Sequence, residues 1–427
     1  MAKITMIGAG SVVFASRLIT DIIYHRELRE STIALMDINS ERLSMINQFA
    51  RTLAKKFAPS MKIEATLNRK EALMEADYVI VMIQVGGIEA FEKDIYIPLK
   101  YGVNQEVGDT IGPGGVFRGL RTIPVLLDIC HDMEEVCPDA LLINYANPMA
   151  INCWAMNRAT KIKNVGLCHS VQGTAMQLAK YINVPYEDVS YWVAGLNHEA
   201  FFLEFKYNGV DAYPLLWEAS KKREIYEKDK VRFEMMKYLG YFITESSHHL
   251  GEYLPYFRTS SERIRAYCEP RWFYLQICKE SWKPHYERLE RQIRGEEPIE
   301  LSRSHEYGVD IILSMETGAV HRINGNVDNK NLISNLPYGC CVEVPCMVDK
   351  NGIHPCNVGD LPPQCAALNR TSINVQELAV KAALERDRNA ALQAVMFDPL
   401  TSAVLTPREI EKMVKEMFEA EAEWIPF

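Results

Sequence analysis

The sequence predicts an α/β protein with a doubly wound, mostly parallel sheet and an interlocked second α+β lobe. Short β-rich runs alternate with amphipathic segments up to about residue 185, the order typical of a parallel sheet covered by helices. Several of these runs end in glycine, asparagine or glutamine, and ligands bind at the carboxyl ends of such strands. Beyond residue 199 the alternation gives way to a charge-rich helical pattern and later strands, which indicates the second lobe.

The first β-rich run and its turn have the order of a Rossmann-type dinucleotide-binding unit. A strand at 3–7 reaches Gly8, Gly10 and Ser11, a helix follows at about 13–25, and a strand at 31–36 ends in Asp37. Two glycines let the backbone approach a pyrophosphate, and Asp37 can accept hydrogen bonds from ribose hydroxyls. A carboxylate there repels a 2′-phosphate, so we expect NAD+ rather than NADP+. Val13 occupies the position of the third small residue, so the glycine pattern is incomplete.

The next elements complete the predicted sheet. We expect helices at 40–57, 69–74 and 116–136, strands at 62–66 and 77–84, and a further strand within 141–148. Gln84 ends one strand and is assigned to the cofactor, whereas Asn147 follows another. A glycine-dense loop at 108–115 contains Asp109 and precedes Arg118. Because these positions gather at one sheet edge, Asn147, Asp109 and Arg118 are candidate substrate contacts. The alternative is a tight turn followed by solvated arginines.

Two further apolar runs stop abruptly in metal-binding residue types. Residues 165–170 contain Cys168, and residues 194–198 end in His198. A thiolate and an imidazole suit a divalent transition metal, which would lie beside the predicted nicotinamide. The alternative is that Cys168 is a small buried hydrophobe and His198 a core histidine.

The second lobe is less regular in sequence. We expect a strand at 199–207, a charge-rich helical region at 217–237, a long exposed helix at 271–294 and strands at 319–327 and 341–348. From residue 373 the chain is mostly helical. We divide it into a Rossmann-type NAD-binding domain, 1–195, and a substrate and oligomerisation domain, 196–427. A polar cluster contains Glu245, His248, His249, Glu252 and Tyr253.

Composition narrows the possible partners. The 427 residues carry a net charge of -9, without a basic tract, which argues against nucleic acid as a partner. The sequence contains no apolar run of the length needed to span a membrane and no signal-peptide pattern at its start. Eleven cysteines show no short repeated framework, so we expect them to be reduced and the protein to be cytoplasmic.

These parts permit two outcomes with a sugar. A metal held by Cys168 and His198 would acidify the C2 and C3 hydroxyls, and NAD+ would accept hydride from C3. The C2 proton then becomes acidic, the C1 oxygen leaves by elimination, water adds, and the retained NADH reduces the ketone. The net reaction is hydrolysis. A sugar or polyol dehydrogenase would use the same residues and stop after hydride transfer.

Six segments resemble glycoside hydrolase family 4, and most closely its bacterial melibiase-type α-galactosidases. They are ITMIGAGSVVF, DTIGPGG, NYANPM, GLCHSVQGT, AGLNHEAF and LPYGCCVEVPCMVDKNGI. The resemblance covers essentially the whole chain. It implies NAD+, a divalent metal, usually Mn2+, a homodimer or homotetramer, and the oxidation–elimination–addition–reduction route, an exception to the two-carboxylate scheme.

The resemblance also assigns individual residues. Cys168 and His198 match the metal ligands, Asn147 matches a substrate-binding asparagine, and Gly8, Gly10 and Asp37 fall at NAD+ contacts. It makes Tyr253 a candidate for the base at C2 and His169 a candidate proton donor. Glu245, His248 and His249 are further candidates for shaping the substrate pocket.

One position departs from the family pattern. Glu199 stands where melibiase-type relatives typically have Met, and it could alter sugar choice, act in proton transfer or point away from the site. The family also contains α-glucosidases, uronidases and 6-phospho-glycosidases, so α-glucosidase and α-galacturonidase remain alternatives. A uronate would need a cationic partner such as Arg118 or Arg121.

Overall fold

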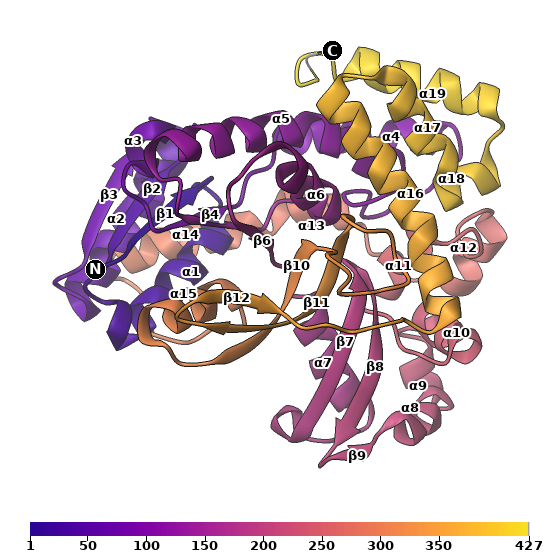
Figure 1. Cartoon of the computed structure of the whole chain (residues 1–427), viewed down its shortest axis with the longest axis horizontal. Helices are drawn as coiled ribbons and strands as arrows, with labels where there is room; N and C mark the ends of the chain where they lie inside the picture. Colours follow the sequence, from indigo (N-terminus) through magenta and orange to yellow (C-terminus); the bar gives the residue numbers. More distant parts are fainter. Residues whose placement is uncertain (426) are drawn as a thin grey trace.

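The computed structural model describes residues 1–425 and 427, and one sheet runs through both halves of the chain (Figure 1). Its first six strands are parallel: β1 (Lys3–Ile7), β2 (Thr32–Met36), β3 (Lys62–Thr66), β4 (Tyr78–Val81), β5 (Leu141–Asn144) and β6 (Asn164–Gly166). Their order is β3-β2-β1-β4-β5-β6, the arrangement of dinucleotide-binding folds. The predicted doubly wound α/β class is therefore confirmed.

The sheet then continues in antiparallel fashion. The remaining strands are β7 (Val189–Leu196), β8 (Glu199–Tyr207), β9 (Val210–Asp211), β10 (His321–Asp328), β11 (Cys341–Asp349) and β12 (Gly352–Pro355). From β6 the order is β10-β11-β7-β8-β9, with β12 beside β11. Gly166 pairs with Asn326, and Gly195 pairs with Glu343. Strands from late in the sequence therefore lie between β6 and β7.

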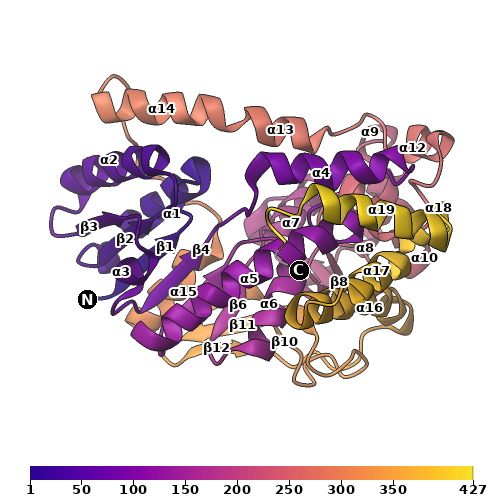
Figure 2. The ribbon, with the colours of Figure 1, turned by 90° about the horizontal axis from the view of Figure 1, so that it is seen from above.

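Helices of the first half cover the parallel strands (Figure 2). Their bounds are α1 (Val12–Tyr24), α2 (Ser40–Phe57), α3 (Arg69–Leu73), α4 (Gly87–Lys100), α5 (Gly112–Val136), α6 (Met149–Ala159) and α7 (Ser170–Tyr181). The loop predicted at 108–115 is shorter than expected, because α5 begins at Gly112. Pro113 lies in the first turn of α5, where its missing N–H costs nothing.

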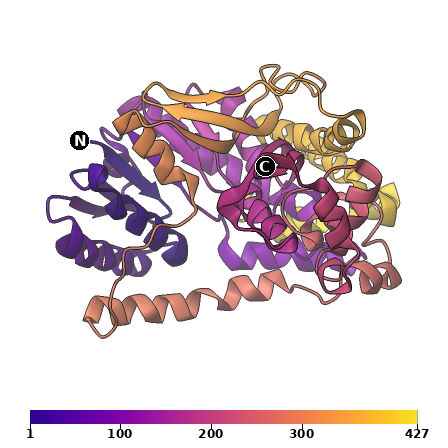
Figure 3. The same ribbon diagram turned by 90° about the horizontal axis from the view of Figure 1, so that it is seen from below.

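The region between β9 and β10 is helical. It contains α8 (Tyr213–Ser220), α9 (Arg223–Tyr226), α10 (Lys230–Leu239), α11 (Ser247–Tyr253), α12 (Ser261–Tyr267), α13 (Tyr274–Glu280), α14 (Trp282–Arg294) and α15 (Tyr307–Thr317). The single helix predicted at 271–294 is wrong, since α13 and α14 are separate. Pro284 lacks the N–H that would bond the carbonyl of Glu280, so the helical ladder breaks there. Figure 3 shows both helices running along one side of the molecule.

Four helices end the chain and pack against the first half. They are α16 (Pro363–Glu385), α17 (Arg388–Phe397), α18 (Pro399–Val404) and α19 (Pro407–Ala420). The segment after α19 returns to α5, where Glu421 Oε2 lies 2.8 Å from Arg121 Nη1. All eleven cysteines are free. Among the described residues, the helices include none long and apolar enough to cross a membrane.

Candidate active site

The turn after β1 brings three backbone segments into close contact. The N–H groups of Gly8 and Ala9 each donate to the carbonyl of Met36 at 3.0 Å. Gly8 has φ +83°, and a Cβ there would lie 2.8 Å from the carbonyl oxygen of Met82. A Cβ on Gly10 would lie 2.7 Å from Asp37 Oδ2. Both predicted glycines are therefore required by the packing of this turn.

The start of α1 can hold an anion. Ser11 is its N-cap, and the Ser11 side chain does not cap the first turn, so the N–H groups of that turn are left for a pyrophosphate. Asp37 accepts from the Gly10 N–H at 2.7 Å and ends β2 as predicted. The turn and this carboxylate fit the pyrophosphate and ribose of NAD+.

Gln84 lies on the loop between β4 and α4, so the prediction that it ends the strand is wrong, because β4 stops at Val81. Its side chain is exposed, and its Nε2 donates to the Gly87 carbonyl at 3.1 Å. Trp424, near the end of the chain, packs against the same loop: a Cβ on Gly86 would lie 3.1 Å from its ring. Lys93 stacks on that ring at 4.2 Å.

Cys168 and His198 meet although thirty positions separate them. Cys168 follows β6, and His198 lies in the two-residue turn between β7 and β8. The Cys168 Sγ is 3.2 Å from His198 Nε2. His198 has φ +64°, a left-handed conformation that β-hairpin turns use but that is uncommon for a non-glycine residue. The turn therefore directs the imidazole toward the thiol.

The two side chains form a thiolate–imidazolium pair. Burial raises the pKa of Cys168, but the charge and hydrogen bond of His198 outweigh it and lower that pKa to about 6. Burial lowers the pKa of His198, and Cys168 in turn raises it to about 10. The thiolate form that metals bind is thus present at neutral pH.

The loop before α5 places a carboxylate, that of Asp109, near the Cys168–His198 pair. Asp109 accepts from the Thr110 hydroxyl at 2.6 Å and from Asn147 Nδ2 at 3.1 Å. Arg118 Nη1 is 4.0 Å from Asp109 Oδ2. Burial raises the pKa of Asp109, but its charged neighbours, Arg118 first among them, bring it below its usual value. The structure therefore places the predicted residues Asp109, Asn147 and Arg118 together.

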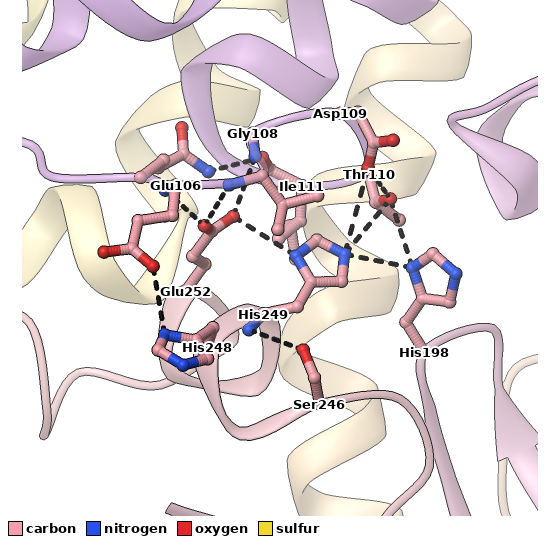
Figure 4. Close-up of polar contacts among 12 residues, drawn as sticks. Glu106, Gly108, Asp109, Thr110, Ile111, His198, Ser246, His248, His249 and Glu252 are labelled. Carbon is pink, nitrogen blue, oxygen red and sulfur yellow. Dashed lines mark hydrogen bonds and ion pairs between the residues drawn. The ribbon is translucent and has the colours of Figure 1, made fainter. Parts of the chain in front are cut away.

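Helix α11 supplies the next residues of the site (Figure 4). The Nε2 of His249 lies 3.0 Å from His198 Nδ1, and the Nδ1 of His249 lies 3.3 Å from Glu252 Oε2. Glu252 also accepts from the backbone N–H groups of residues 106–108. The loop that carries Asp109 and the helix that carries His249 are thus joined through one buried carboxylate.

Tyr253 follows on the same helix. Its ring packs edge-on against His249, with 5.2 Å between ring centroids. Its side chain is buried, and its hydroxyl has no hydrogen-bond partner among the described residues. Burial and then the carboxylates of Glu199 and Asp109 raise the pKa of Tyr253 well above its usual value, so the hydroxyl keeps its proton in this arrangement.

The other predicted site residues lie around this core. Glu199 is fully buried, and its Oε2 accepts from Asn369 of α16 at 3.2 Å. His169 is exposed at the start of α7, and its Nδ1 is 3.8 Å from Glu306 Oε1. Arg121 is fully buried and bound to Asp94 and Glu421; the expectation that Arg121 could face a uronate is therefore wrong.

Several polar residues of the site were missed by sequence reasoning. Asn197, Asn326 and Glu343 are buried, and each leaves at least one side-chain atom without a partner among the described residues. Glu343 interrupts an apolar strand run, a signal that could have identified it. Glu252 belongs to the predicted polar cluster but was given no role there, although it lies three positions after His249, a spacing that puts both on one helix face. Thr110 gave no sequence signal beyond its neighbour Asp109.

The donor set fits a divalent metal in an open site. A thiolate sulfur and an imidazole nitrogen at 3.2 Å need only a small separation to share one ion, whose bonds would be about 2.3 Å to sulfur and about 2.1 Å to nitrogen. Within residues 1–425 and 427, no three His, Cys, Asp or Glu side chains form a metal cage. An ion held by Cys168 and His198 would have its other positions available to water or substrate oxygens, as in catalytic sites.

The strand order, the glycine turn and the thiolate–imidazole pair define a Rossmann-type α/β enzyme. Residues 3–184 match the family model described as "Family 4 glycosyl hydrolase", and residues 193–401 match the model for the C-terminal domain of the same family. The chain belongs to glycosyl hydrolase family 4.

Similar proteins cover the chain end to end. An α-galactosidase of Bacillus subtilis (strain 168) is 43% identical over 430 residues, covering 100% of this chain and 99% of its own. An α-galactosidase of Rhizobium meliloti (strain 1021) is 40% identical, with 99% and 89% covered. An α-galacturonidase of Thermoanaerobacterium saccharolyticum is 31% identical, with 97% and 95% covered.

Solved structures share the fold. The B. subtilis protein lplD is 28% identical, has a TM-score of 0.88, and covers 98% of this chain and 99% of its own. The 6-phospho-β-glucosidase of Thermotoga maritima, crystallised with manganese, NAD+ and glucose-6-phosphate, is 22% identical, with a TM-score of 0.84 and 99% of each chain covered.

Proposed function

We propose that this protein is an NAD+- and Mn2+-dependent α-glycosidase that acts on terminal α-galactosides. The observation that carries the proposal is the 3.2 Å contact between Cys168 Sγ and His198 Nε2 in a family 4 chain. The choice of galactosides follows the two relatives named α-galactosidase, at 43% and 40% identity. When bound, NAD+ supplies a reversible hydride acceptor, and the divalent cation acidifies sugar hydroxyls.

The protein's own residues have distinct proposed roles. Gly8, Gly10, Ser11, Asp37 and Gln84 hold the cofactor, and Cys168 and His198 hold the cation. The cluster of Asn147, Asp109, Arg118 and His249 orients the sugar.

Two residues are proposed to move protons. Tyr253 would accept the proton from sugar C2 as its phenolate, so its hydroxyl must first lose its own proton to solvent. Positive charge bound nearby would favour that loss, because it lowers the pKa of Tyr253 against the effect of the carboxylates. His169, on the exposed rim, donates to the leaving oxygen. Glu199, held by Asn369, is proposed to affect sugar choice from behind the site.

The test is a panel of nitrophenyl glycosides assayed with NAD+, Mn2+ and a thiol. We expect release of nitrophenol from the α-galactoside, with no net NADH. Preference for the α-galacturonide would instead assign the activity of the 31% identical relative, and steady NADH accumulation would indicate a dehydrogenase. In D2O the galactose released should carry deuterium at C2, and exclusive protium there would contradict the elimination route.

We further propose a cytoplasmic homodimer or homotetramer. The free cysteines and the net charge of -9 are compatible with this setting. Residues 1–195 and 196–427 are proposed as interlocked cofactor and substrate domains, supported by the shared sheet. Sedimentation velocity of the purified protein measures the assembly.

A further inference from the structure

The carboxylate of Glu252 is saturated with hydrogen-bond donors. Its Oε1 accepts from the backbone N–H groups of Glu106 at 2.6 Å and Val107 at 2.7 Å. Its Oε2 accepts from the N–H of Gly108 at 2.9 Å and faces His249 Nδ1 at 3.3 Å. A carboxylate offers about four acceptor positions and no donor. The His249 nitrogen that faces Glu252 must therefore carry a hydrogen.

A hydrogen on Nδ1 of His249 also determines whether its other ring nitrogen, Nε2, donates or accepts a hydrogen bond. With its proton on Nδ1, a neutral His249 presents a lone pair at Nε2. That Nε2 lies 3.0 Å from His198 Nδ1. His198 Nδ1 must then be the donor, as Figure 4 lets the reader follow from Glu252 through His249 to His198.

A second, independent contact acts on the same nitrogen. The Thr110 hydroxyl donates its single hydrogen to Asp109 Oδ1 at 2.6 Å. Its oxygen, 3.2 Å from His198 Nδ1, is therefore an acceptor. Two acceptors, one from the loop and one from α11, thus face the Nδ1–H of His198.

We propose that Glu252, through His249, and Asp109, through Thr110, hold a proton of His198 on Nδ1, so that Nε2 is the nitrogen that gives up its proton and binds the divalent cation. Nε2 is the atom that lies 3.2 Å from Cys168 Sγ. Glu252, His249 and Thr110 are positioning residues in this scheme. The proposal rests on the proposed function, which places a cation between Cys168 and His198. Groups that orient a ligating histidine typically change metal affinity by about 10- to 100-fold.

The first experiment measures Mn2+ binding without NAD+ or sugar. Free Mn2+ is followed by electron paramagnetic resonance for the wild type and Glu252→Gln. Glutamine has one acceptor oxygen where glutamate has two, so it cannot serve both the backbone N–H groups and His249. We expect Mn2+ to bind about 10- to 100-fold more weakly.

The matched control is Glu106→Gln. Glu106 is a buried carboxylate in the same loop, and only its backbone N–H contacts Glu252. Its side-chain oxygens lie against His248, Arg258 and Arg271, so the substitution leaves the contacts of the histidine relay in place. This variant is expected to keep the wild-type affinity for Mn2+ within about threefold, a change far smaller than a lost orienting group causes.

The second route has its own pair of variants. Thr110→Val removes the acceptor oxygen while keeping the side-chain shape, and Thr110→Ser restores a hydroxyl. We expect weaker Mn2+ binding for valine and recovery for serine. These variants also test the relay if Glu252→Gln does not fold.

The readout specific to positioning is the tautomer of His249. Long-range 1H–15N correlation on metal-free protein labelled with [15N]histidine should show Nδ1–H for His249 in the wild type and an altered population in Glu252→Gln. An Nε2–H tautomer in the wild type would overturn the relay, as would wild-type Mn2+ binding by both Glu252→Gln and Thr110→Val.

Mn2+ binding by Cys168→Ser distinguishes failure of the proposed function from failure of the relay. If Cys168→Ser binds Mn2+ as tightly as the wild type, the cation site itself is wrong, and with it the purpose of the relay. Loss of binding in Cys168→Ser together with unchanged binding in the relay variants refutes the relay alone.

Discussion

Cys168 owes its reactivity to a partner that lies thirty positions away in the sequence. The His198 charge lowers the pKa of the thiol to about 6, against the effect of burial. A lowered thiol pKa means that the nucleophilic thiolate forms above that pH and disappears as the pH falls through it.

In metal-free protein we therefore expect alkylation of Cys168 by iodoacetamide to rise through about pH 6 and to level off before pH 8. Peptide mass spectrometry at a series of pH values measures the rate. His198→Asn should move the midpoint toward that of a free thiol. A wild-type midpoint near 9 would show that no thiolate–imidazolium pair exists.

Glu199 carries a second residue-level expectation. Burial raises its pKa to about 8, although Ser372 and Asn369 act in the opposite direction. A carboxyl with a raised folded-state pKa stabilises the fold most at low pH, and that contribution declines as the pH rises from about 4.5 to about 8, by at most about 1.4 kcal/mol per pH unit.

Glu199→Gln should remove this decline. The difference in Tm between the variant and the wild type is expected to grow in favour of glutamine from pH 5 to pH 8. Glu30→Gln, at an exposed position, serves as the control and should show no such trend. A constant difference across this range would mean that Glu199 is ionised in the folded protein.

The start of α5 and the loop before it are packed backbone against backbone. A Cβ on Gly115 would overlap the carbonyl carbon of Thr110. Gly173 of α7 is a useful contrast, because a Cβ there would meet no atom within 4 Å.

Gly115→Ala is expected to cost about 1–3 kcal/mol in the free energy of unfolding, the usual effect of overpacking. Because Thr110 must move, Mn2+ affinity should fall as well. Gly173→Ala should be neutral or stabilise the helix by about 0.5–1 kcal/mol. Urea titrations of both variants measure the free energy of unfolding. Equal values for the two variants would show that the loop before α5 can shift without cost.

The sequence allowed most elements to be predicted where the pattern is local. The strand at 62–66, the helix at 40–57 and the strand at 199–207 have the predicted bounds. The break between α13 and α14 was missed because the charge pattern continues across Pro284. The resemblance to the family predicted that Cys168 and His198 act together as metal ligands. The roles of Glu252 and Thr110 could not be predicted, because they depend on a helix and a loop that meet only in the folded chain.

At the scale of the whole molecule, the C-terminal segment closes back onto the cofactor half. Arg121 is fully buried between Asp94 and Glu421, with Nη1 2.8 Å from Glu421 Oε2. Asp94 still pairs with Arg121 when Glu421 is removed, but the buried guanidinium then loses one of its hydrogen-bond acceptors, which is costly in a buried position.

Glu421→Ala should therefore lower the free energy of unfolding by about 1–3 kcal/mol. Glu423→Ala, at an exposed position of the same segment, should change it by less than about 0.5 kcal/mol. Chemical denaturation of the two variants compares them directly, and similar midpoints would mean that the segment contributes little.

The place of β10 and β11 in the sheet also governs the order of assembly. During synthesis, β6 and the β7–β8 hairpin leave the ribosome long before β10 and β11, the strands that join them. Gly166 of β6 pairs with Asn326 of β10, and Gly195 of β7 pairs with Glu343 of β11. Until then both present bare edges that invite pairing with other chains. A nascent chain arrested before residue 321 should therefore depend on chaperones.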